Sequence, residues 1–352
     1  MARQEHLRDN SNPSVPDTLI PAACAPMVLW IAGAHVIWMT KANSLRGIPP
    51  PPGQFRSVSA GRDHSCGVRT NGILVCWGRH YLGQARPPTG LWRAVSVGGF
   101  HTCGVRTDGT VDCWGLNDYG QSWPSTGPFL SVSAGRSHTC GVRTDYTVAC
   151  WGSSEYQYGE AVPPAGQFAS VSAGEYHTCG VRTDGTVACW GRNNYGQATP
   201  PAGSFQSIDA GGFHTCGVRT DGAVACWGVT IRDQDPPAGR FQSVSAGLYY
   251  TCGVRSDGNL ACWGAGDAED DSEYGWGQAT PPSGEFQSVD AGVFHTCGVR
   301  TNGTVACWGR NLDGETDAPA VEQFQSVSAG GGHTCGVRIN GTVDCWGDKD
   351  DG

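Results

Sequence analysis

Cysteine is the residue whose spacing in this chain points most directly to chemistry. Of its 17 cysteines, 16 form eight pairs, and the members of each pair are ten positions apart. The pairs are Cys66 and Cys76, Cys103 and Cys113, Cys140 and Cys150, Cys179 and Cys189, Cys216 and Cys226, Cys252 and Cys262, Cys297 and Cys307, and Cys335 and Cys345. Such thiols could form disulfides or remain reduced as small buried side chains. A zinc site is disfavoured because no Cys-x-x-Cys motif occurs.

Each cysteine pair lies in a near-identical phrase, seen best as HTCGVRTDGTVACWG from His177 to Gly191. Consecutive first cysteines are 37, 37, 39, 37, 36, 45 and 38 residues apart. A period of this size is typical of repeat architectures. Most of the repeated residues are therefore expected to be scaffold, and function is expected where the copies differ.

The elements that carry the cysteines are expected to be short strands. Glycine (53 residues) and proline (21 residues) are abundant, and no stretch shows a 3.6-residue apolar period. In the fourth copy, the pattern predicts strands over 168–174, 177–182 and 186–191. Radial repetition of small antiparallel sheets forms a β-propeller. The sequence thus predicts an all-β fold: a single β-propeller of eight repeat blades, with seven as the alternative.

The turn between the second and third strands decides whether the cysteines can meet. Thr183-Asp184-Gly185 suits a type I turn whose last residue is a glycine in the left-handed conformation. Arg182 then pairs with Thr186, and Cys179 lies opposite Cys189, with Cα atoms about 4.5 Å apart. A two-residue turn would place the two cysteines on opposite faces. Seven copies have Asp-Gly or Asn-Gly here, and Asp145-Tyr146 is the exception.

The phrase V-x-A-G-x-x-H-T-C-G-V-R-x-x-G-x-V-x-C-W-G, followed by N-x-x-G-Q, resembles the regulator of chromosome condensation repeat family. Its paired cysteines are similar to those in the ectodomain repeats of CRINKLY-type plant receptor kinases and of exported bacterial relatives. The resemblance covers about 300 residues. It implies a propeller, usually of seven blades, and functions that are mostly recognition. These include nucleotide exchange on a small GTPase, light sensing and inhibition of secreted β-lactamases.

Several classes of function are disfavoured by composition and motifs. The net charge is -9, and eight of the 23 basic residues are the arginines of the repeated CGVR phrase, so a nucleic-acid partner is not expected. No nucleophile elbow, P-loop or kinase signature occurs, so we expect neither an enzyme nor a cofactor. The acidic insertion at 267–273 lacks the spacing of a calcium loop.

A histidine recurs at one position of the repeat. It is His64, His101, His138, His177, His214, His295 or His333, and Tyr250 replaces it in the remaining copy. A ring of imidazoles could bind metal. The favoured interpretation is one histidine per blade that hydrogen-bonds its own backbone, with no metal.

The loop between the first two strands varies while its flanks do not. Five copies place an aromatic residue directly before the repeated His or Tyr: Phe100, Tyr176, Phe213, Tyr249 and Phe294. Arg62, Arg136 and Glu175 occupy the same loops. In a closed ring these side chains should converge on one face near the axis. They could form a recognition surface with exposed rings, or they could cap the cores between blades.

These observations predict a non-enzymatic protein- or glycan-binding module that acts outside the cytoplasm, extracellular or at the cell surface, as a monomer. The alternative is a cytosolic regulator of a small GTPase or another enzyme, with reduced cysteines. Residues 1–35 are expected to form a tail or a signal- or anchor-like segment, and 36–352 the propeller. Leu19–Thr40 contains no charged residue apart from the titratable His35 and could span a membrane. Alternatively, residues 36–48 form a strand that pairs with the eighth blade, so that N- and C-terminal strands close the ring.

Overall fold

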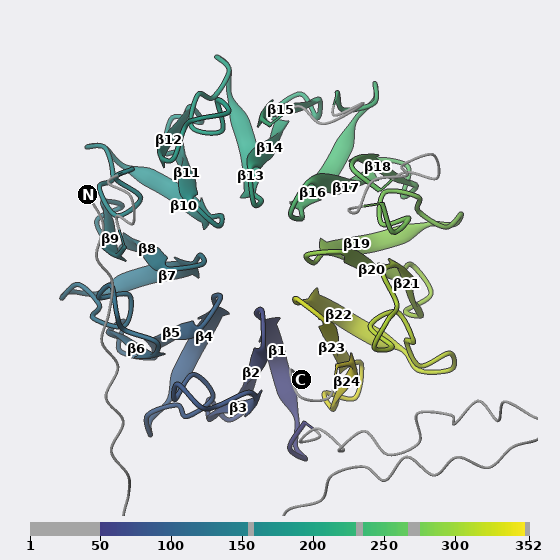
Figure 1. The fold of residues 1–352 in the computed structure, drawn as a ribbon, viewed down its shortest axis with the longest axis horizontal. Coiled ribbons are helices and arrows are strands. Elements are labelled where there is room, and N and C mark those ends of the chain that lie inside the picture. Colours follow the sequence, from purple (N-terminus) through teal and green to yellow (C-terminus); the bar gives the residue numbers. More distant parts are fainter. Residues whose placement is uncertain (1–49, 154–157, 230–234, 267–274, 349–352) are drawn as a thin grey trace, which may run out of the picture. The chain divides into compact units, whose positions relative to one another are not determined.

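The computed structural model describes residues 50–153, 158–229, 235–266 and 275–348. All of these belong to the second of the two units into which the chain divides, Asn43–Gly352. The described residues form eight antiparallel sheets, each of three strands in sequence order. The sheets are arranged radially as blades 1 to 8 of a propeller (Figure 1). The predicted all-β propeller of eight blades is confirmed.

Every blade repeats the same three strands from the axis outward (Figure 1). The first, innermost strands are β1 (Phe55–Ala60), β4 (Trp92–Val97), β7 (Phe129–Ala134), β10 (Phe168–Ala173), β13 (Phe205–Ala210), β16 (Phe241–Ala246), β19 (Phe286–Ala291) and β22 (Phe324–Ala329). The middle strands are β2 (His64–Arg69), β5 (His101–Arg106), β8 (His138–Arg143), β11 (His177–Arg182), β14 (His214–Arg219), β17 (Tyr250–Arg255), β20 (His295–Arg300) and β23 (His333–Arg338). The outer strands are β3 (Leu74–Gly78), β6 (Val111–Gly115), β9 (Val148–Gly152), β12 (Val187–Gly191), β15 (Val224–Gly228), β18 (Leu260–Gly264), β21 (Val305–Gly309) and β24 (Val343–Gly347).

The turn chemistry sets the register of β11 and β12 as predicted. The Arg182 N–H donates to the Thr186 carbonyl at 2.7 Å, and Gly185 has φ +85°. Cys179 lies opposite Cys189 with their Cα atoms 4.0 Å apart, and the two are joined by a disulfide.

The seven other predicted cysteine pairs form the same cross-strand disulfide within their own blades. These bonds join Cys66 to Cys76, Cys103 to Cys113, Cys140 to Cys150, Cys216 to Cys226, Cys252 to Cys262, Cys297 to Cys307 and Cys335 to Cys345. In each blade the first cysteine is on the middle strand and the second is on the outer strand. A two-residue turn is inconsistent with this geometry, and the bonded pairs favour disulfides over reduced cysteines.

Tyr146 occupies the left-handed turn position where the other copies have glycine, with φ +67°. A side chain in this conformation costs about 1 kcal/mol. We therefore expect Tyr146→Gly to raise the free energy of unfolding by about 1 kcal/mol, measured by urea denaturation. Tyr146→Ala keeps a Cβ at the same φ and should bring no such gain. An equal gain from both variants would contradict the backbone explanation.

The cores lie between neighbouring blades and are built from the first and outer strands. In blade 4, Phe168 meets Trp190 edge to face at 5.9 Å, and both pack with Cys140 of blade 3. An aromatic pair of this kind occurs in every blade. Gly180 lies beneath the Phe168 ring, where an added Cβ would be 2.6 Å from the ring edge. Only glycine fits at this position of the middle strand.

The repeated arginine has a structural role in each blade. The Arg182 guanidinium stacks over Phe168 at 4.7 Å and donates to the Ala165 carbonyl of the linker before the blade at 3.0 Å. The stacking recurs with the arginines of six further blades. These arginines hold the proline-rich linkers against the blades. They are scaffold, as the repetition indicated.

The repeated histidines do not bond their own backbone, so that prediction was wrong. His177 Nε2 is hydrogen-bonded to Thr215 Oγ1 of the next blade at 2.6 Å. The same contact joins His64 to Thr102, His101 to Thr139, His138 to Thr178, His214 to Thr251, His295 to Thr334 and His333 to Ser65. Tyr250 donates to the His295 carbonyl at 2.6 Å. The middle-strand backbone is already used in the sheet, so the buried ring bonds across the blade boundary.

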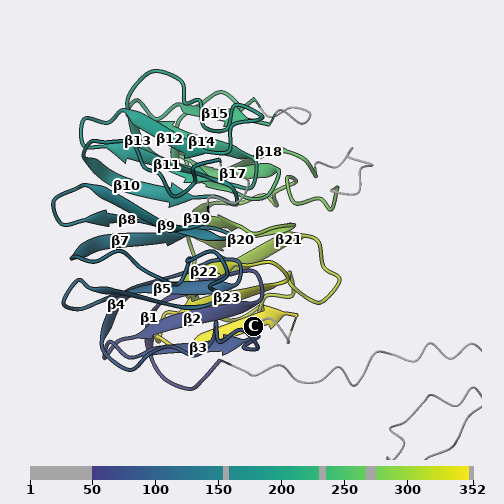
Figure 2. The same cartoon turned by 60° about the vertical axis from the view of Figure 1, so that its left-hand side comes forward.

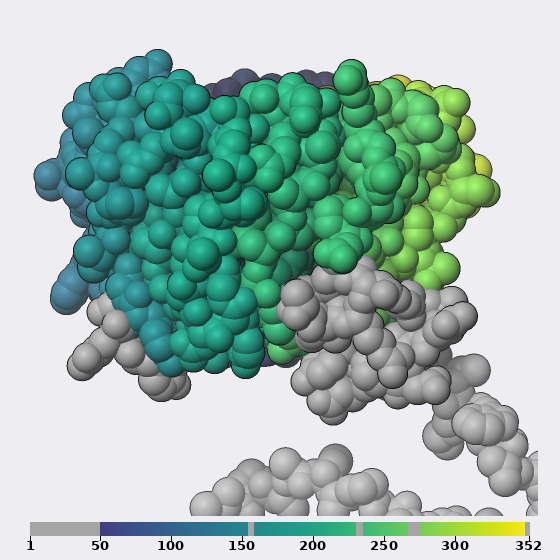
Figure 3. Space-filling model, turned by 90° about the horizontal axis from the view of Figure 1, so that it is seen from above, coloured from purple at the N-terminus to yellow at the C-terminus, as the bar shows by residue number. Residues whose placement is uncertain are grey.

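The ring closes by direct packing of blade 1 against blade 8. Besides the bond between Ser65 and His333, the Ala60 N–H donates to Ser328 Oγ at 3.0 Å and the Phe55 N–H donates to the Gly341 carbonyl at 2.6 Å. Neighbouring blades lie side by side (Figure 2), and their atoms are closely packed on the side seen in Figure 3. The predicted closing strand at 36–48 and the apolar stretch Leu19–Thr40 lie outside the described residues. Within the described ranges, no helix is long and apolar enough to cross a membrane.

Candidate functional site

The loops that join the first and middle strands of all eight blades surround a cavity of about 620 Å³ around the axis. These inner loops begin with a glycine for a steric reason. A Cβ added to Gly174 would lie 2.2 Å from the Gly211 carbonyl oxygen of the next blade. The equivalent glycines are Gly61, Gly98, Gly135, Gly211, Gly247, Gly292 and Gly330, each with a Cβ position within 2.6 Å of the next blade or of Tyr250. The loops therefore pack edge to edge, and most of their variable residues line the cavity.

One side of the cavity is an aromatic arc on blades 4 to 6. The rings of Tyr176 and Phe213 lie 5.7 Å apart, and Phe213 stacks on Tyr249 at 4.9 Å with an interplanar angle of 6°. Leu248 lines the cavity beside them. Each of the three rings is partly buried, because each packs against its neighbours while one surface remains accessible. They offer an apolar platform next to the axis.

Phe294 and Phe100 lie outside this arc. Phe294 lines the cavity on blade 7, where the guanidinium of Arg310 lies 5.9 Å from its ring. Phe100 is not among the residues that line the cavity, and its ring lies beneath Arg62 at 5.5 Å. Both rings are partly buried. The structure thus brings four of the five predicted aromatics to the cavity wall.

The predicted charged residues lie on blades 1, 3 and 4, and each is in an ion pair. Arg136 lies 3.3 Å from Glu175 and donates to the Tyr176 hydroxyl at 2.5 Å. Arg62 lies 3.9 Å from Asp63. Burial raises the pKa of the Asp63 carboxyl, while nearby arginines partly offset this effect. The cavity is therefore amphipathic, with the pair of Arg136 and Glu175 next to the aromatic arc and the pair of Arg62 and Asp63 on blade 1.

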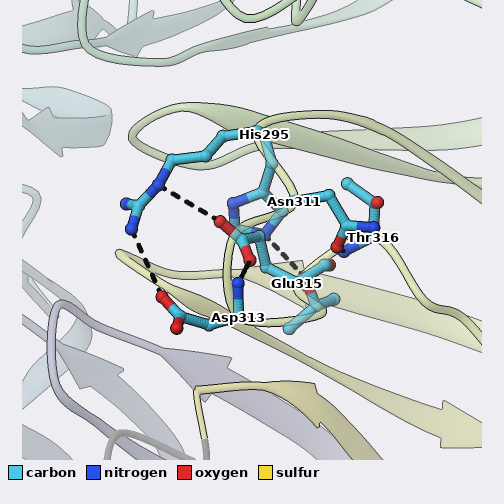
Figure 4. Close-up of polar contacts among 7 residues, drawn as sticks. His295, Asn311, Asp313, Glu315 and Thr316 are labelled. Carbon is cyan, nitrogen blue, oxygen red and sulfur yellow. Dashed lines mark hydrogen bonds and ion pairs between the residues drawn. The ribbon is translucent and has the colours of Figure 1, made fainter. Parts of the chain in front are cut away.

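The position directly after Trp-Gly was not singled out from the sequence, although it differs between copies. Figure 4 shows its arrangement in blade 7, where the Arg310 guanidinium lies 3.4 Å from both Asp313 and Glu315. The buried Glu315 also accepts from the Asp313 N–H at 2.8 Å. The Arg310 N–H donates to the Phe294 carbonyl at 2.9 Å, so this loop adjoins the inner loop of its blade. The face around the cavity thus includes a second, outer set of loops.

Two carboxylates replace serine in the hydrogen bonds nearest the axis. In six blades a serine of the first strand accepts from an N–H of the next blade, as Ser172 Oγ accepts from Ala210 at 3.0 Å. Asp209 and Asp290 take this place in blades 5 and 7. Burial raises the pKa of both, to about 6 for Asp290. Among the described residues, no group of three or more His, Cys, Asp or Glu could hold a metal ion.

The repeat unit matches the family model for the Regulator of chromosome condensation (RCC1) repeat. The matched ranges are 55–84, 92–121, 129–157, 168–197, 205–229, 241–268, 286–315 and 324–352. The chain belongs to the RCC1 repeat family. Its eight matches coincide with the eight blades, and the predicted resemblance is confirmed. No match was found among curated protein sequences.

Solved structures similar to this RCC1-repeat chain include two plant receptor ectodomains. The ectodomain of the Physcomitrella patens receptor kinase CR4 is 27% identical with TM-score 0.58, over 73% of each chain. The CRINKLY ectodomain of the Arabidopsis thaliana receptor kinase ACR4 is 27% identical with TM-score 0.55, over 73% of this chain and 95% of that one. Prp20p from Saccharomyces cerevisiae is 16% identical with TM-score 0.56, over 84% and 92%, and shares the fold.

Proposed function

We propose that this RCC1-repeat chain is a non-enzymatic binding module that acts outside the cytoplasm and recognises a protein or glycan through the face around the axis. The observation that carries the proposal is the 620 Å³ cavity. Its wall contains most of the loop residues that vary between otherwise repeated blades, together with repeated alanines and glycines. A partly accessible aromatic platform beside charged groups is typical of binding sites and interface anchors.

The location outside the cytoplasm is supported by the disulfides and by the relatives. Eight disulfides within one domain are typical of oxidising compartments and rare in the cytosol. The two similar structures at 27% identity are ectodomains of receptor kinases. The alternative, a cytosolic regulator with reduced cysteines, has no comparable support.

The carboxylates of the cavity argue for binding rather than for catalysis. Two of them, Glu175 and Asp313, each lie within 4 Å of an arginine. A carboxylate in an ion pair is a weaker general base than a free one of raised pKa. This arrangement supports a recognition surface.

The proposal is tested by screening the oxidised protein against arrays of secreted and cell-surface ectodomains and of glycans. We expect the double variant Phe213→Ala/Tyr249→Ala to weaken binding of an array partner by about 100-fold or more, because two central aromatic anchors are lost. The control Ile73→Ala/Leu91→Ala removes exposed apolar side chains at the opposite ends of the strands and should bind as the wild type does. The proposed face would be excluded if Phe213→Ala/Tyr249→Ala bound the partner as the wild type does, or if only Ile73→Ala/Leu91→Ala lost binding.

A further inference from the structure

Among the described residues, five arginines lie in the inner loops or directly after Trp-Gly on the cavity-bearing face. Arg62 and Arg136 are in inner loops, and Arg79, Arg192 and Arg310 follow Trp-Gly. Four of them have a carboxylate partner: Arg62 and Arg79 at Asp63, Arg136 at Glu175, and Arg310 at Asp313 and Glu315. Among the residues that the structure describes, none places a carboxylate oxygen within 4.0 Å of Arg192.

Blade 7 provides an internal comparison for Arg192. Around Arg310 the two acidic partners are Asp313 and Glu315 (Figure 4). The corresponding residues of blade 4 are Tyr195 and Gln197. The loop itself is built alike, because Gln197 Oε1 accepts from the Tyr195 N–H at 2.9 Å, as Glu315 accepts from Asp313 at 2.8 Å. Blade 4 thus keeps the arginine and the loop but lacks both counter-charges.

Aromatic rings take the place of those carboxylates. The Arg192 guanidinium carbon lies 5.7 Å from the centroid of Tyr158, 5.4 Å from Tyr176, 5.6 Å from Tyr195 and 5.7 Å from Phe213. Its Nε is buried and has no hydrogen-bond partner within the described part of the chain. Rings stabilise a cation but accept no strong hydrogen bond from it, so the Nε donor of the guanidinium stays unsatisfied in a partly buried place.

We propose that Arg192 and these four rings form an anion site that takes the carboxylate of a single Asp or Glu side chain of a protein partner. Guanidinium and carboxylate match as a charge-assisted, two-pronged hydrogen-bonded pair. Tyr176 and Phe213 belong both to this site and to the aromatic arc, so apolar residues next to the acid would lie on the platform formed with Tyr249. The inference rests on the proposed function and names the chemistry of the partner.

The charge of the face favours one carboxylate over a polyanionic glycan. A polyanion is held by several cations at once, and the four other arginines already pair with carboxylates of this chain. The chain as a whole carries a net charge of -9, which disfavours approach of a highly charged anion. A protein loop that carries one acid among apolar residues needs only one unpaired arginine and brings little negative charge to the face.

The experiment selects a phage-displayed library of random linear peptides on the immobilised, oxidised full chain. The proteins used are the wild type, Arg192→Gln and the control Arg79→Gln. Peptides enriched on the wild type and on the control should carry an acidic residue beside apolar ones. A selected Glu peptide should bind the wild type about 10-fold more tightly than its Gln version does. Arg192→Gln should remove this difference, and Arg192→Lys should keep part of it.

Each other outcome overturns the inference. It fails if acidic residues are not enriched on the wild type, or if the difference between Glu and Gln persists in Arg192→Gln. Binding of uronate-containing glycans that is lost in Arg192→Gln would assign the site to a glycan instead of a protein. If purely apolar peptides bind the wild type but not Phe213→Ala/Tyr249→Ala, the inference of an acid-binding site is wrong. The proposed function is still supported in that case. A thermal melt of every variant separates unfolding from loss of the site.

Discussion

Acidification from pH 7 to about pH 4 is expected to unfold the propeller cooperatively, because seven histidines are buried in the contacts between blades. Burial lowers the pKa of His64, His101, His177 and His295 to about 3, and that of His138, His214 and His333 to about 4. In the unfolded chain these imidazoles titrate near pH 6.5. The unfolded state therefore binds more protons between about pH 6.5 and pH 4, and the free energy of unfolding falls as the pH falls through this window.

The expected effect is large because the histidines act together. Each contributes about 1.4 kcal/mol per pH unit well below pH 6.5, so seven give on the order of 10 kcal/mol per unit, comparable to the whole stability of a domain. Asp63, Asp209 and Asp290 oppose this trend, since their raised pKa values make the folded state take up protons. Three carboxyls offset only part of the effect of seven imidazoles.

Tryptophan fluorescence and urea denaturation across pH 7 to pH 4 measure this dependence. The control is His177→Tyr, which copies the arrangement of blade 6, where Tyr250 occupies the same place and bonds to the next blade. The variant should take up one proton fewer on unfolding and show a shallower slope. Stability that is flat between pH 6.5 and pH 4, or a slope unchanged in His177→Tyr, would show that these imidazoles do not govern acid unfolding.

Loss of one disulfide is expected to lower the free energy of unfolding by about 2–3 kcal/mol. The variant is Cys179→Ala/Cys189→Ala in blade 4, where the first cysteine is fully buried. The reason is that the bond restricts an unfolded loop, so its removal increases the entropy of the unfolded chain. Reduction of all eight disulfides should unfold the propeller. The summed loss of free energy exceeds the stability of an ordinary domain, although the single losses do not add fully.

Urea denaturation of the double variant and circular dichroism of the reduced protein check this prediction. Ser170→Ala, an exposed substitution in the same blade, serves as the control and should change stability by less than about 0.5 kcal/mol. A reduced protein that keeps its native spectrum and melting temperature would show that packing alone holds the blades together.

The parts of the fold that could be predicted are those that one repeat specifies locally. The Thr-Asp-Gly turn fixes the register of β11 and β12, and this register places Cys179 opposite Cys189. Contacts between blades were not predictable in this way. The partner of His177 is Thr215 of the next blade, 38 residues further on, and only the radial placement of blades brings them together.

The candidate site was predicted in outline for the same reason. Variation in the inner loops pointed to the residues around the axis, and the glycine contacts explain why these loops converge. The stacking of Phe213 on Tyr249 and the rings around Arg192 depend on neighbouring blades and on a second loop. The one available signal was the residue after Trp-Gly, which is Arg192 in blade 4 and Arg310 in blade 7, with Tyr195 and Asp313 close by in each loop.

The central claim is a disulfide-linked propeller that matures in an oxidising compartment, and a thiol count tests it most directly. The protein purified from its native source, denatured without reductant and with thiols blocked during lysis, is titrated for free thiols. The 16 paired cysteines should give no free thiol, so we expect at most one per chain, from Cys24. A count near 17 would mean that the cysteines are reduced in the cell, and it would contradict the account in favour of a cytosolic protein.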